Sequence, residues 1–349
     1  MKLKRLTALL LSVMLVLSLA ACGGGKDAKD DSADGDLSGK EIIIGNITPV
    51  TGAQAAYGLA ITNSIQMAID EINADGGILG ATVKLSTKDD QGTPAEAVSG
   101  FNSLLSEGAA AIVGATLSSC TSAITSLADD EGIVLVTPSS TADSITTTDD
   151  YVFRSCFKDS FQGEMVAAYA KDQGWTKAAV LYATGDTYSS GLHDSFVKAA
   201  EKYGIEIVCE QSSSDTGAVD FSSQLATIAA SGADMLFAPY YYDAVGPKII
   251  PQAREAGFKG AIMGCDGFDG TQDYTTGDLS AYENVYFTNH YSPEDSSEIV
   301  QSYVKNYTEK YGSESMNALG ALAYDAMYMV KQAIEKAGSI DHEAIRDAM

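Results

Sequence analysis

Two kinds of apolar pattern alternate along most of the sequence. Short runs of β-branched residues, such as Ile42-Ile43-Ile44, predict buried strands. Between these runs, apolar residues recur every three or four positions, as in Ile61, Ile65 and Ile69, which would share one face of a helix. Regular alternation of strand and helix predicts parallel sheets covered by helices on both faces.

The alternation divides into two units. The first unit has predicted strands at 42–44, 81–87, 110–114 and 133–136 and predicted helices at 58–73, 94–106 and 119–131. The second unit follows Tyr151-Val152-Phe153, with strands at 177–183, 205–210, 235–238, 260–264 and 284–289 and helices at 161–173, 190–203, 219–230, 244–256, 294–311 and 318–337. Each unit predicts a doubly wound α/β lobe. We expect an N-terminal lobe of residues 41–158 and 289–349, onto which the last two helices return, a C-terminal lobe of residues 159–288, and a ligand cleft between them.

The start of the chain predicts export. Lys2, Lys4 and Arg5 precede the uncharged apolar run 6–19, which is typical of a secretory signal. The run is shorter than the roughly 20 residues that a membrane-spanning helix needs. Residues 1–21 are therefore predicted to be a signal peptide.

The signal ends in Leu19-Ala20-Ala21-Cys22, which resembles the lipobox of bacterial lipoproteins. This resemblance implies a lipid on Cys22, although ordinary secretion with an unmodified cysteine remains the alternative. Residues 22–40 are rich in Gly and Asp, with Leu37 as their one large apolar side chain, and predict a flexible tether. We expect a protein anchored by lipid to the outer face of the cell membrane, in a cell of the Gram-positive type.

The charge of the chain excludes some partners. The formal net charge is -25, and removal of Lys2, Lys4 and Arg5 with the signal gives -25 - 3 = -28. Nucleic acid and anionic lipid surfaces would repel such a protein.

The remaining cysteines and the histidines do not form recognisable sites. The cysteines are widely spaced and predict buried free thiols rather than a zinc site, with disulfide pairing left open: Cys120, Cys156, Cys209 and Cys265. The histidines lie in charged or loop segments without metal-binding or catalytic companions, and we expect them at the surface: His193, His290 and His342. The sequence also lacks Walker, GxGxxG and GxSxG motifs after its strands. We predict no enzyme activity, cofactor or metal.

Hydroxyl groups follow two neighbouring predicted strands of the first unit. Thr116 and Ser118 come after strand 110–114, and Ser139 and Thr141 come after strand 133–136. Ligands of open α/β sheets bind at the carboxyl ends of the strands. Hydroxyl and free N–H groups at this edge suit a carboxylate, with plain helix capping as the alternative.

Acidic and aromatic residues follow two strands of the second unit. Strand 235–238 leads into Tyr240-Tyr241-Tyr242, and strand 260–264 leads into Cys265-Asp266-Gly267. An acid beside aromatic faces suits an ammonium group. A tyrosine-rich loop with a turn-forming Asp-Gly is the alternative.

A series of motifs in this order is similar to one family. The motifs are Gly114-x-x-x-Ser118, Thr137-Pro138-Ser139-Ser140-Thr141, Phe153-Arg154-x4-Asp159-x3-Gly163, Tyr241-Tyr242, Gln252-Ala253-Arg254-Glu255-Ala256-Gly257 and Gly264-x-Asp266-Gly267. They resemble periplasmic binding proteins of the leucine/isoleucine/valine class, the receptors of branched-chain amino-acid ABC transporters, over residues 41–349. The resemblance implies the type I periplasmic-binding fold, whose two lobes are joined by three crossovers and close on an amino acid.

The resemblance also assigns site residues. It implies that Ser118 and Thr141 hold the ligand carboxylate through their hydroxyls, and that Ser139 offers its backbone carbonyl to the ammonium. Asp266 corresponds to the acid that pairs with the ammonium. Tyr241 stands beside Asp266 and would help to fix the ammonium, whereas Tyr57 and Tyr188 match aromatic positions near the ligand side chain.

Three features depart from the family pattern. Asp266 is one methylene shorter than the glutamate of the best-known members, so the ammonium would sit deeper or be reached through water. A cysteine pair that bridges the first binding loop in some members is absent. Members also continue beyond the position of Met349 through the third crossover and a closing strand pair, and we expect this sequence to lack them.

Together these observations predict a monomeric solute receptor that binds a branched-chain or other apolar amino acid and delivers it to ABC permease subunits. A ligand such as an amide, a short peptide or an aromatic acid is the first alternative, and a ligand sensor for a signalling partner is the second. The identity of the amino acid, which depends on how Tyr57, Leu117, Tyr188 and residues 268–274 pack, stays open.

Overall fold

The computed structural model describes residues 35–147, 150–313 and 315–349. The predicted signal peptide, Cys22 and the tether up to residue 34 lie outside the described residues. Over the part of the chain that is described, no helix is both long enough and apolar enough to cross a bilayer.

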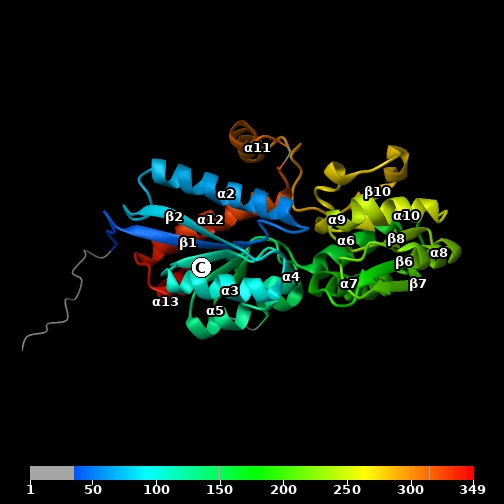
Figure 1. The fold of residues 1–349 in the computed structure, drawn as a ribbon, viewed down its shortest axis with the longest axis horizontal. Helices are drawn as coiled ribbons and strands as arrows, with labels where there is room; N and C mark the ends of the chain where they lie inside the picture. The colour runs from blue at the N-terminus through cyan, green and yellow to red at the C-terminus, as the bar shows by residue number, and fades with distance from the viewer. Residues whose placement is uncertain (1–34, 148–149, 314) are drawn as a thin grey trace, which may run out of the picture.

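Two five-stranded parallel sheets form the centres of two lobes that lie side by side along the long axis of the molecule (Figure 1). The first sheet has the order β2-β1-β3-β4-β5. Its strands are β1 (Glu41–Thr48), β2 (Thr82–Asp89), β3 (Ala111–Gly114), β4 (Leu135–Thr137) and β5 (Val152–Arg154). The helices that follow them are α2 (Ala55–Ala74), α3 (Pro94–Ser106), α4 (Ser118–Ser122), α5 (Thr125–Glu131) and the short 3-10 helix η1 (Asp143–Thr146).

The second sheet has the order β10-β9-β8-β6-β7. Its strands are β6 (Lys177–Ala183), β7 (Glu206–Ser213), β8 (Met235–Phe237), β9 (Ala261–Gly264) and β10 (Val285–Phe287). Its helices are α6 (Asp159–Asp172), α7 (Thr187–Tyr203), α8 (Ser222–Ala230), α9 (Tyr242–Ala244), the π-helix η2 (Val245–Ile249), α10 (Ile250–Glu255) and the 3-10 helices η3 (Asp266–Phe268), η4 (Thr271–Tyr274) and η5 (Leu279–Tyr282). The predicted lobe boundary at 158/159 falls between the last strand of the first sheet and the first strand of the second, and the boundary at 288/289 follows β10. Both boundaries stay a prediction.

The last three helices pack against elements of the first lobe (Figure 1). They are α11 (Glu298–Tyr311), α12 (Ala318–Ala337) and α13 (His342–Ala348). Gly320 of α12 lies so close to α2 that an added Cβ would be 3.1 Å from the Ala60 carbonyl oxygen. In α11, the Tyr303 hydroxyl is 2.9 Å from Ser64 Oγ of α2.

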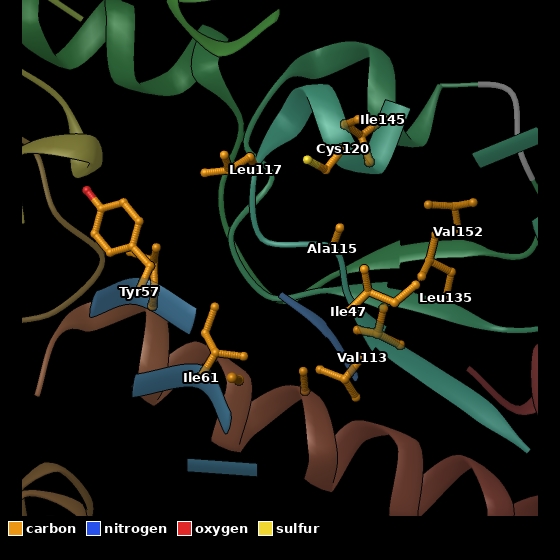
Figure 2. Close-up of a cluster of buried hydrophobic side chains, with 14 of the residues drawn as sticks. Ile47, Tyr57, Ile61, Val113, Ala115, Leu117, Cys120, Leu135, Ile145 and Val152 are labelled. Atoms are coloured by element: carbon orange, nitrogen blue, oxygen red, sulfur yellow. The ribbon is translucent and has the colours of Figure 1, made fainter. Parts of the chain in front are cut away.

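Parallel strands that are covered on both faces form the core of the first lobe. Ile47, Val113 and Leu135 come from β1, β3 and β4, are fully buried, and lie near one another (Figure 2). Strands of this kind require apolar residues at successive positions, which explains the short continuous runs in the sequence. Cutting one such side chain back to alanine typically costs about 2–5 kcal/mol.

The structure corrects two helix predictions. Residues 119–131 form two helices, α4 and α5, because hydroxyl residues such as Ser122 and Thr125 are weak helix formers and Ile124 turns into the core. Residues 244–256 form α9, η2 and α10. Pro251, in the first turn of α10, has no N–H to continue the α-helical ladder, which fits the wider π turn before it.

The cysteines agree with the prediction of free thiols. Cys120, Cys156 and Cys265 are buried, Cys209 is half-buried, and all four are free.

Candidate functional site

A narrow cavity with a free volume of about 10 Å³ lies between the two lobes. It is bordered by the carboxyl ends of β3 and β4 in the first lobe and of β8 and β9 in the second. The lining residues are Tyr57, Thr116, Leu117, Ser118, Ser139, Tyr188, Tyr241, Asp266, Gly267 and Leu319. Six of the seven predicted ligand-binding residues therefore meet in one cavity, whereas Thr141 is not among its lining residues. Their binding of a ligand stays a prediction.

Hydrogen bonds hold the hydroxyl loops of the first lobe together. The Ala142 N–H donates to Ser118 Oγ at 3.3 Å, and Ser139 Oγ donates to the Thr116 carbonyl at 2.8 Å. These bonds connect the segment after β3 to the segment after β4. The two loops thus form one polar wall, although α4 has only five residues and offers a weaker helix dipole than the predicted longer helix would.

Arg154 fixes the position of the second loop. Its guanidinium donates to the carbonyl oxygens of Ser140, Thr141 and Ala142 at 2.9–3.1 Å, and its Nε donates to Thr146 Oγ1 at 3.0 Å. A guanidinium carries five N–H donors in one plane, so it can bond to several neighbouring oxygens at once. Arg154 therefore shapes the loop that carries Ser139 and Thr141.

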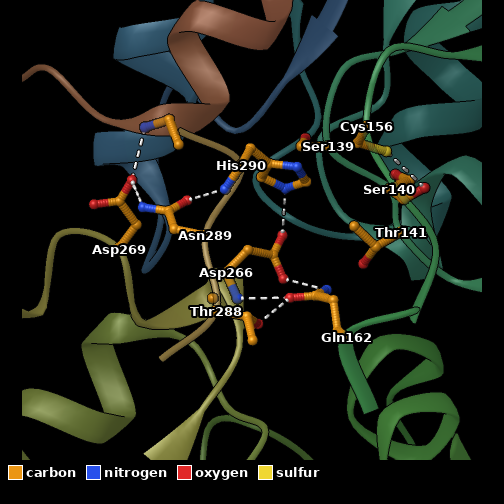
Figure 3. A network of polar contacts seen from close by, with 12 residues as sticks. Ser139, Ser140, Thr141, Cys156, Gln162, Asp266, Asp269, Thr288, Asn289 and His290 are labelled. Atoms are coloured by element: carbon orange, nitrogen blue, oxygen red, sulfur yellow. Dashed lines mark hydrogen bonds and ion pairs between the residues drawn. The ribbon is translucent and has the colours of Figure 1, made fainter. Parts of the chain in front are cut away.

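Asp266 on η3 provides the acidic group of the cavity. Its Oδ1 accepts hydrogen bonds from Tyr188 at 3.0 Å and from Gln162 Nε2 at 2.8 Å. Its Oδ2 is 3.4 Å from His290 Nε2 (Figure 3). Because Oδ1 already has two donors, Oδ2 is the oxygen with capacity for a ligand.

His290 corrects the prediction of surface histidines. Its side chain is only 3 % exposed, and its ring stacks on Phe157 with centroids 3.7 Å apart. His193 is also largely covered, with 13 % of its side chain exposed, because it stacks on Tyr182. The segment after β10 brings His290 to Asp266, and a contact between such distant parts of the chain leaves no periodic signal in the sequence.

Gln162 is the other polar partner that the sequence analysis missed. It is fully buried on α6, where its Oε1 accepts from Thr288 Oγ1 at 2.7 Å and from the Asp266 N–H at 3.1 Å. The sequence contained one signal for this role. Gln162 is a polar residue on the face that the predicted helix 161–173 would bury. Gln162 therefore holds both the backbone and the side chain of Asp266.

Three tyrosines form the aromatic part of the site. Tyr188 and Tyr241 stack with centroids 5.0 Å apart, and Tyr57 meets Tyr241 edge-on at 6.4 Å. Burial raises the pKa of each hydroxyl, so all three stay protonated hydrogen-bond donors. The Tyr57 hydroxyl donates to the Gly267 carbonyl of the other lobe at 2.6 Å.

Further bonds connect the lobes beside the cavity. The Tyr242 hydroxyl donates to the Ala53 carbonyl at 2.9 Å, and Gln54 Nε2 donates to Asp243 Oδ1 at the same distance. Asp269 Oδ2 accepts from the Ala318 N–H at the start of α12, at 2.7 Å. The cleft is therefore closed in this conformation, and a bound solute would be shielded from water.

Two lining residues, Gly267 and Leu319, were given no place at the site from the sequence, whereas Thr116 and Leu117 were expected beside it. Leu319 comes from α12, more than 200 residues away in sequence from Leu117. Only the return of α12 to the first lobe brings it to the cavity, so local patterns could not predict it.

A comparison with protein families decides the identity of the fold. The family described as periplasmic binding protein matches residues 41–349. The chain belongs to the periplasmic binding protein family. Members of this family bind substrates without transforming them, which agrees with the predicted lack of enzyme activity.

Comparisons with individual relatives and solved structures give the degree of similarity within the family. This periplasmic binding protein is 31 % identical over 313 residues to the Leu/Ile/Val-binding protein homolog 3 of Brucella melitensis, covering 87 % of this chain and 81 % of that protein. Among solved structures, the leucine-binding protein LivK of Thermotoga maritima is 32 % identical with a TM-score of 0.82, covering 88 % and 86 % of the two chains. LivJ of Streptococcus pneumoniae, in complex with isoleucine, is 31 % identical with a TM-score of 0.80, covering 88 % and 87 %. The predicted fold and the resemblance to the leucine/isoleucine/valine class are confirmed.

Proposed function

We propose that this periplasmic binding protein captures a zwitterionic apolar amino acid between its lobes and delivers it to an ABC permease. Ser118 and Thr141 bind the carboxylate, while the Ser139 carbonyl and Asp266 bind the ammonium. Tyr241 lies beside Asp266 at the ammonium, and Tyr57 and Tyr188 lie near the side chain. A lipid on Cys22 keeps the receptor near its permease after export.

The observation that carries this proposal is the meeting of hydroxyls from one lobe and a carboxylate from the other in one closed cavity. Ser118 and Ser139 stand on the first lobe, and Asp266 stands on the second. An amino acid has two charged groups of opposite sign on one carbon, so it can bond to both walls at once. A relative by sequence is named a Leu/Ile/Val-binding protein homolog, and a solved structure of the same fold is named a leucine-binding protein.

Calorimetric titration of Asp266→Ala with the amino acid that wild type binds most tightly tests the site. Loss of the acid leaves the ligand ammonium buried without its charge partner, and we expect affinity to fall by about 2–5 kcal/mol. Asp172→Ala, at the exposed end of α6, is the matched control and should bind as wild type does. Unchanged affinity in Asp266→Ala would contradict the assignment.

A further inference from the structure

His290 contacts Asp266 of the ligand cavity and also lines a second cavity. Its Nε2 is 3.4 Å from Asp266 Oδ2, the carboxylate oxygen with capacity for a ligand (Figure 3). The second cavity has a free volume of about 250 Å³ and lies between the segment after β10 and helices α11 and α12. Asn306 and Asp325 add polar groups to it, and it is roomy enough for water. Protons from solvent therefore reach a ring that is only 3 % exposed.

The ring of His290 has partners in both its neutral and its charged form. When the ring is neutral, its Nε2–H donates to Asp266 Oδ2. When the ring carries a second proton, the same contact becomes a stronger, charge-assisted bond. The face of Phe157, with ring centroids 3.7 Å apart, adds cation–π attraction for the charged form. These two contacts offset the cost of burying a positive charge at this point.

A proton on His290 is the one positive charge that the described residues supply at Asp266. Neither a lysine nor an arginine of the described chain forms an ion pair with this acid, and Arg154 directs its guanidinium to loop carbonyl oxygens. The other titratable groups around His290 are acids, phenols and a thiol: Cys156, Asp159, Asp269, Tyr291, Tyr303, Tyr324 and Asp325. Burial raises the pKa of each of them, so the thiol and the phenols stay uncharged.

We propose that a proton on His290 competes with the ligand's ammonium group for Asp266 Oδ2, so that the protein binds its amino acid more weakly as pH falls. This inference rests on the proposed function and deepens it. In the empty protein at low pH, the protonated ring donates to Oδ2. An ammonium group that reaches the same oxygen would lie beside a second positive charge, so the extra ring proton leaves to solvent as the ligand binds. Protonation therefore favours the empty protein, and acidification favours release of the ligand.

Calorimetric titration at pH 8 and at pH 5.5 tests this competition. The probe is L-leucine, or the free apolar amino acid that wild type binds most tightly at pH 8, and its own two charges do not change over this range. Histidines ordinarily change their charge between about pH 5 and pH 8, so we expect wild type to bind roughly 10-fold more weakly at pH 5.5. His290→Gln keeps an N–H donor but carries no charge, and its affinity should be the same at both pH values.

His193→Gln is the matched control. His193 is likewise covered by a stacked ring, that of Tyr182, but its nitrogens contact Asp194 and Glu210 of the second lobe. This variant removes a histidine that does not contact Asp266, and it should keep the pH dependence of wild type.

NMR titration of the histidine rings is a second measurement, which does not require His290→Gln to fold. The chain has three histidines. In protein without a histidine tag, His193→Gln and His342→Gln identify two of the ring signals and leave that of His290. We expect the His290 signal to change with pH in the empty protein, and to change at lower pH once the ligand is bound.

Three results would overturn the inference alone. They are equal affinity of wild type at the two pH values, the same pH dependence in His290→Gln as in wild type, and a His290 signal that does not change between pH 5 and pH 8. Failure of wild type to bind any amino acid at pH 8 overturns the proposed function.

Discussion

At the scale of single residues, backbone atoms at Gly267 organise the cavity as much as side chains do. The Gly267 N–H donates to the Tyr188 hydroxyl at 2.8 Å, and its carbonyl accepts from Tyr57 at 2.6 Å. A Cβ at this position would be 2.7 Å from the Tyr188 hydroxyl oxygen and 2.8 Å from the Tyr240 carbonyl oxygen. The residue after Asp266 must therefore be small.

Gly267→Ala should damage binding more than stability. The methyl group displaces Tyr188 from Asp266, so we expect at least a 10-fold loss of ligand affinity, measured by calorimetry, as for a lost charge-assisted bond. Gly217→Ala, on an exposed loop, is the control. If Gly267→Ala binds as tightly as wild type, the Tyr188–Asp266 contact is not part of the site.

Asp90 predicts a specific pH dependence of stability. It is fully buried at the end of β2, its Oδ2 has no partner, and burial raises its pKa to about 6. Between pH 4 and pH 6 the folded state then binds more protons than the unfolded state, so this group destabilises the protein as pH rises. The free energy of unfolding of Asp90→Asn, relative to that of wild type, should increase by about 3 kcal/mol between pH 4 and pH 8.

Urea unfolding of both proteins at several pH values measures this difference. Asp89→Asn is a control of opposite sign, because hydrogen bonds from Thr51 outweigh partial burial and lower the pKa of Asp89. The free energy of unfolding of wild type, relative to that of Asp89→Asn, should increase as pH rises. A pH-independent difference between Asp90→Asn and wild type would contradict the raised pKa of Asp90.

The cavity residues that directly follow strands were predictable, because parallel strands place their carboxyl ends at one edge of the sheet. Ser118, Ser139 and Asp266 follow strands directly, so a strand assignment alone brings them to one edge. Gln162 and His290 could not be found in this way, because their contacts with Asp266 depend on how α6 and the segment after β10 pack against η3.

At the scale of elements, the start of α12 connects the lobes. Asp269, in the loop between η3 and η4, accepts from the Ala318 N–H and from Asn289 Nδ2 at 2.7 and 3.1 Å. A carboxylate at a helix N-terminus is favourable because it meets free N–H groups and the positive end of the helix dipole. This bond lies outside the cavity and stabilises the closed arrangement.

Asp269→Ala should therefore weaken ligand binding without touching the ligand. We expect affinity to fall by about 1–2 kcal/mol, measured by calorimetric titration, because closure loses a charge-assisted bond. Asp278→Ala removes a comparable carboxylate that caps Ser280 within the second lobe, and binding should be unchanged. Equal affinities for Asp269→Ala and wild type would show that this bond does not contribute to closure.

The elements themselves were largely predictable, because apolar periodicity reports burial directly. The predicted helix 94–106 and strand 177–183 have the same bounds as α3 and β6. The division of 119–131 into two helices was not predicted, since it depends on Ile124 turning into the core.

At the scale of the whole molecule, the two lobes and the predicted lipid anchor would serve one task. A receptor that releases its solute to a permease benefits from a tether that keeps it near the membrane. The high negative charge of the chain does not provide this attachment, because anionic lipid surfaces repel it.

Cys22→Ser should separate the receptor from the membrane. Without the thiol no lipid can be attached, and we expect the protein to move from the membrane fraction to the soluble fraction or the medium, measured by fractionation and immunoblotting. Cys209→Ser is the control and should stay with the membrane. Retention of Cys22→Ser at the membrane would contradict the lipid anchor.

The central claim is that the cleft recognises both charged groups of an amino acid. Thermal unfolding with L-leucine, with 4-methylpentanoate, which lacks the ammonium, and with isopentylamine, which lacks the carboxylate, tests it most directly. We expect a large rise in melting temperature with leucine, or with another apolar amino acid if leucine is inactive, since ligand at 100 times its dissociation constant adds about 2.7 kcal/mol. Neither analogue should match it. A rise with 4-methylpentanoate equal to that with the amino acid, or no rise with any amino acid, would contradict the claim.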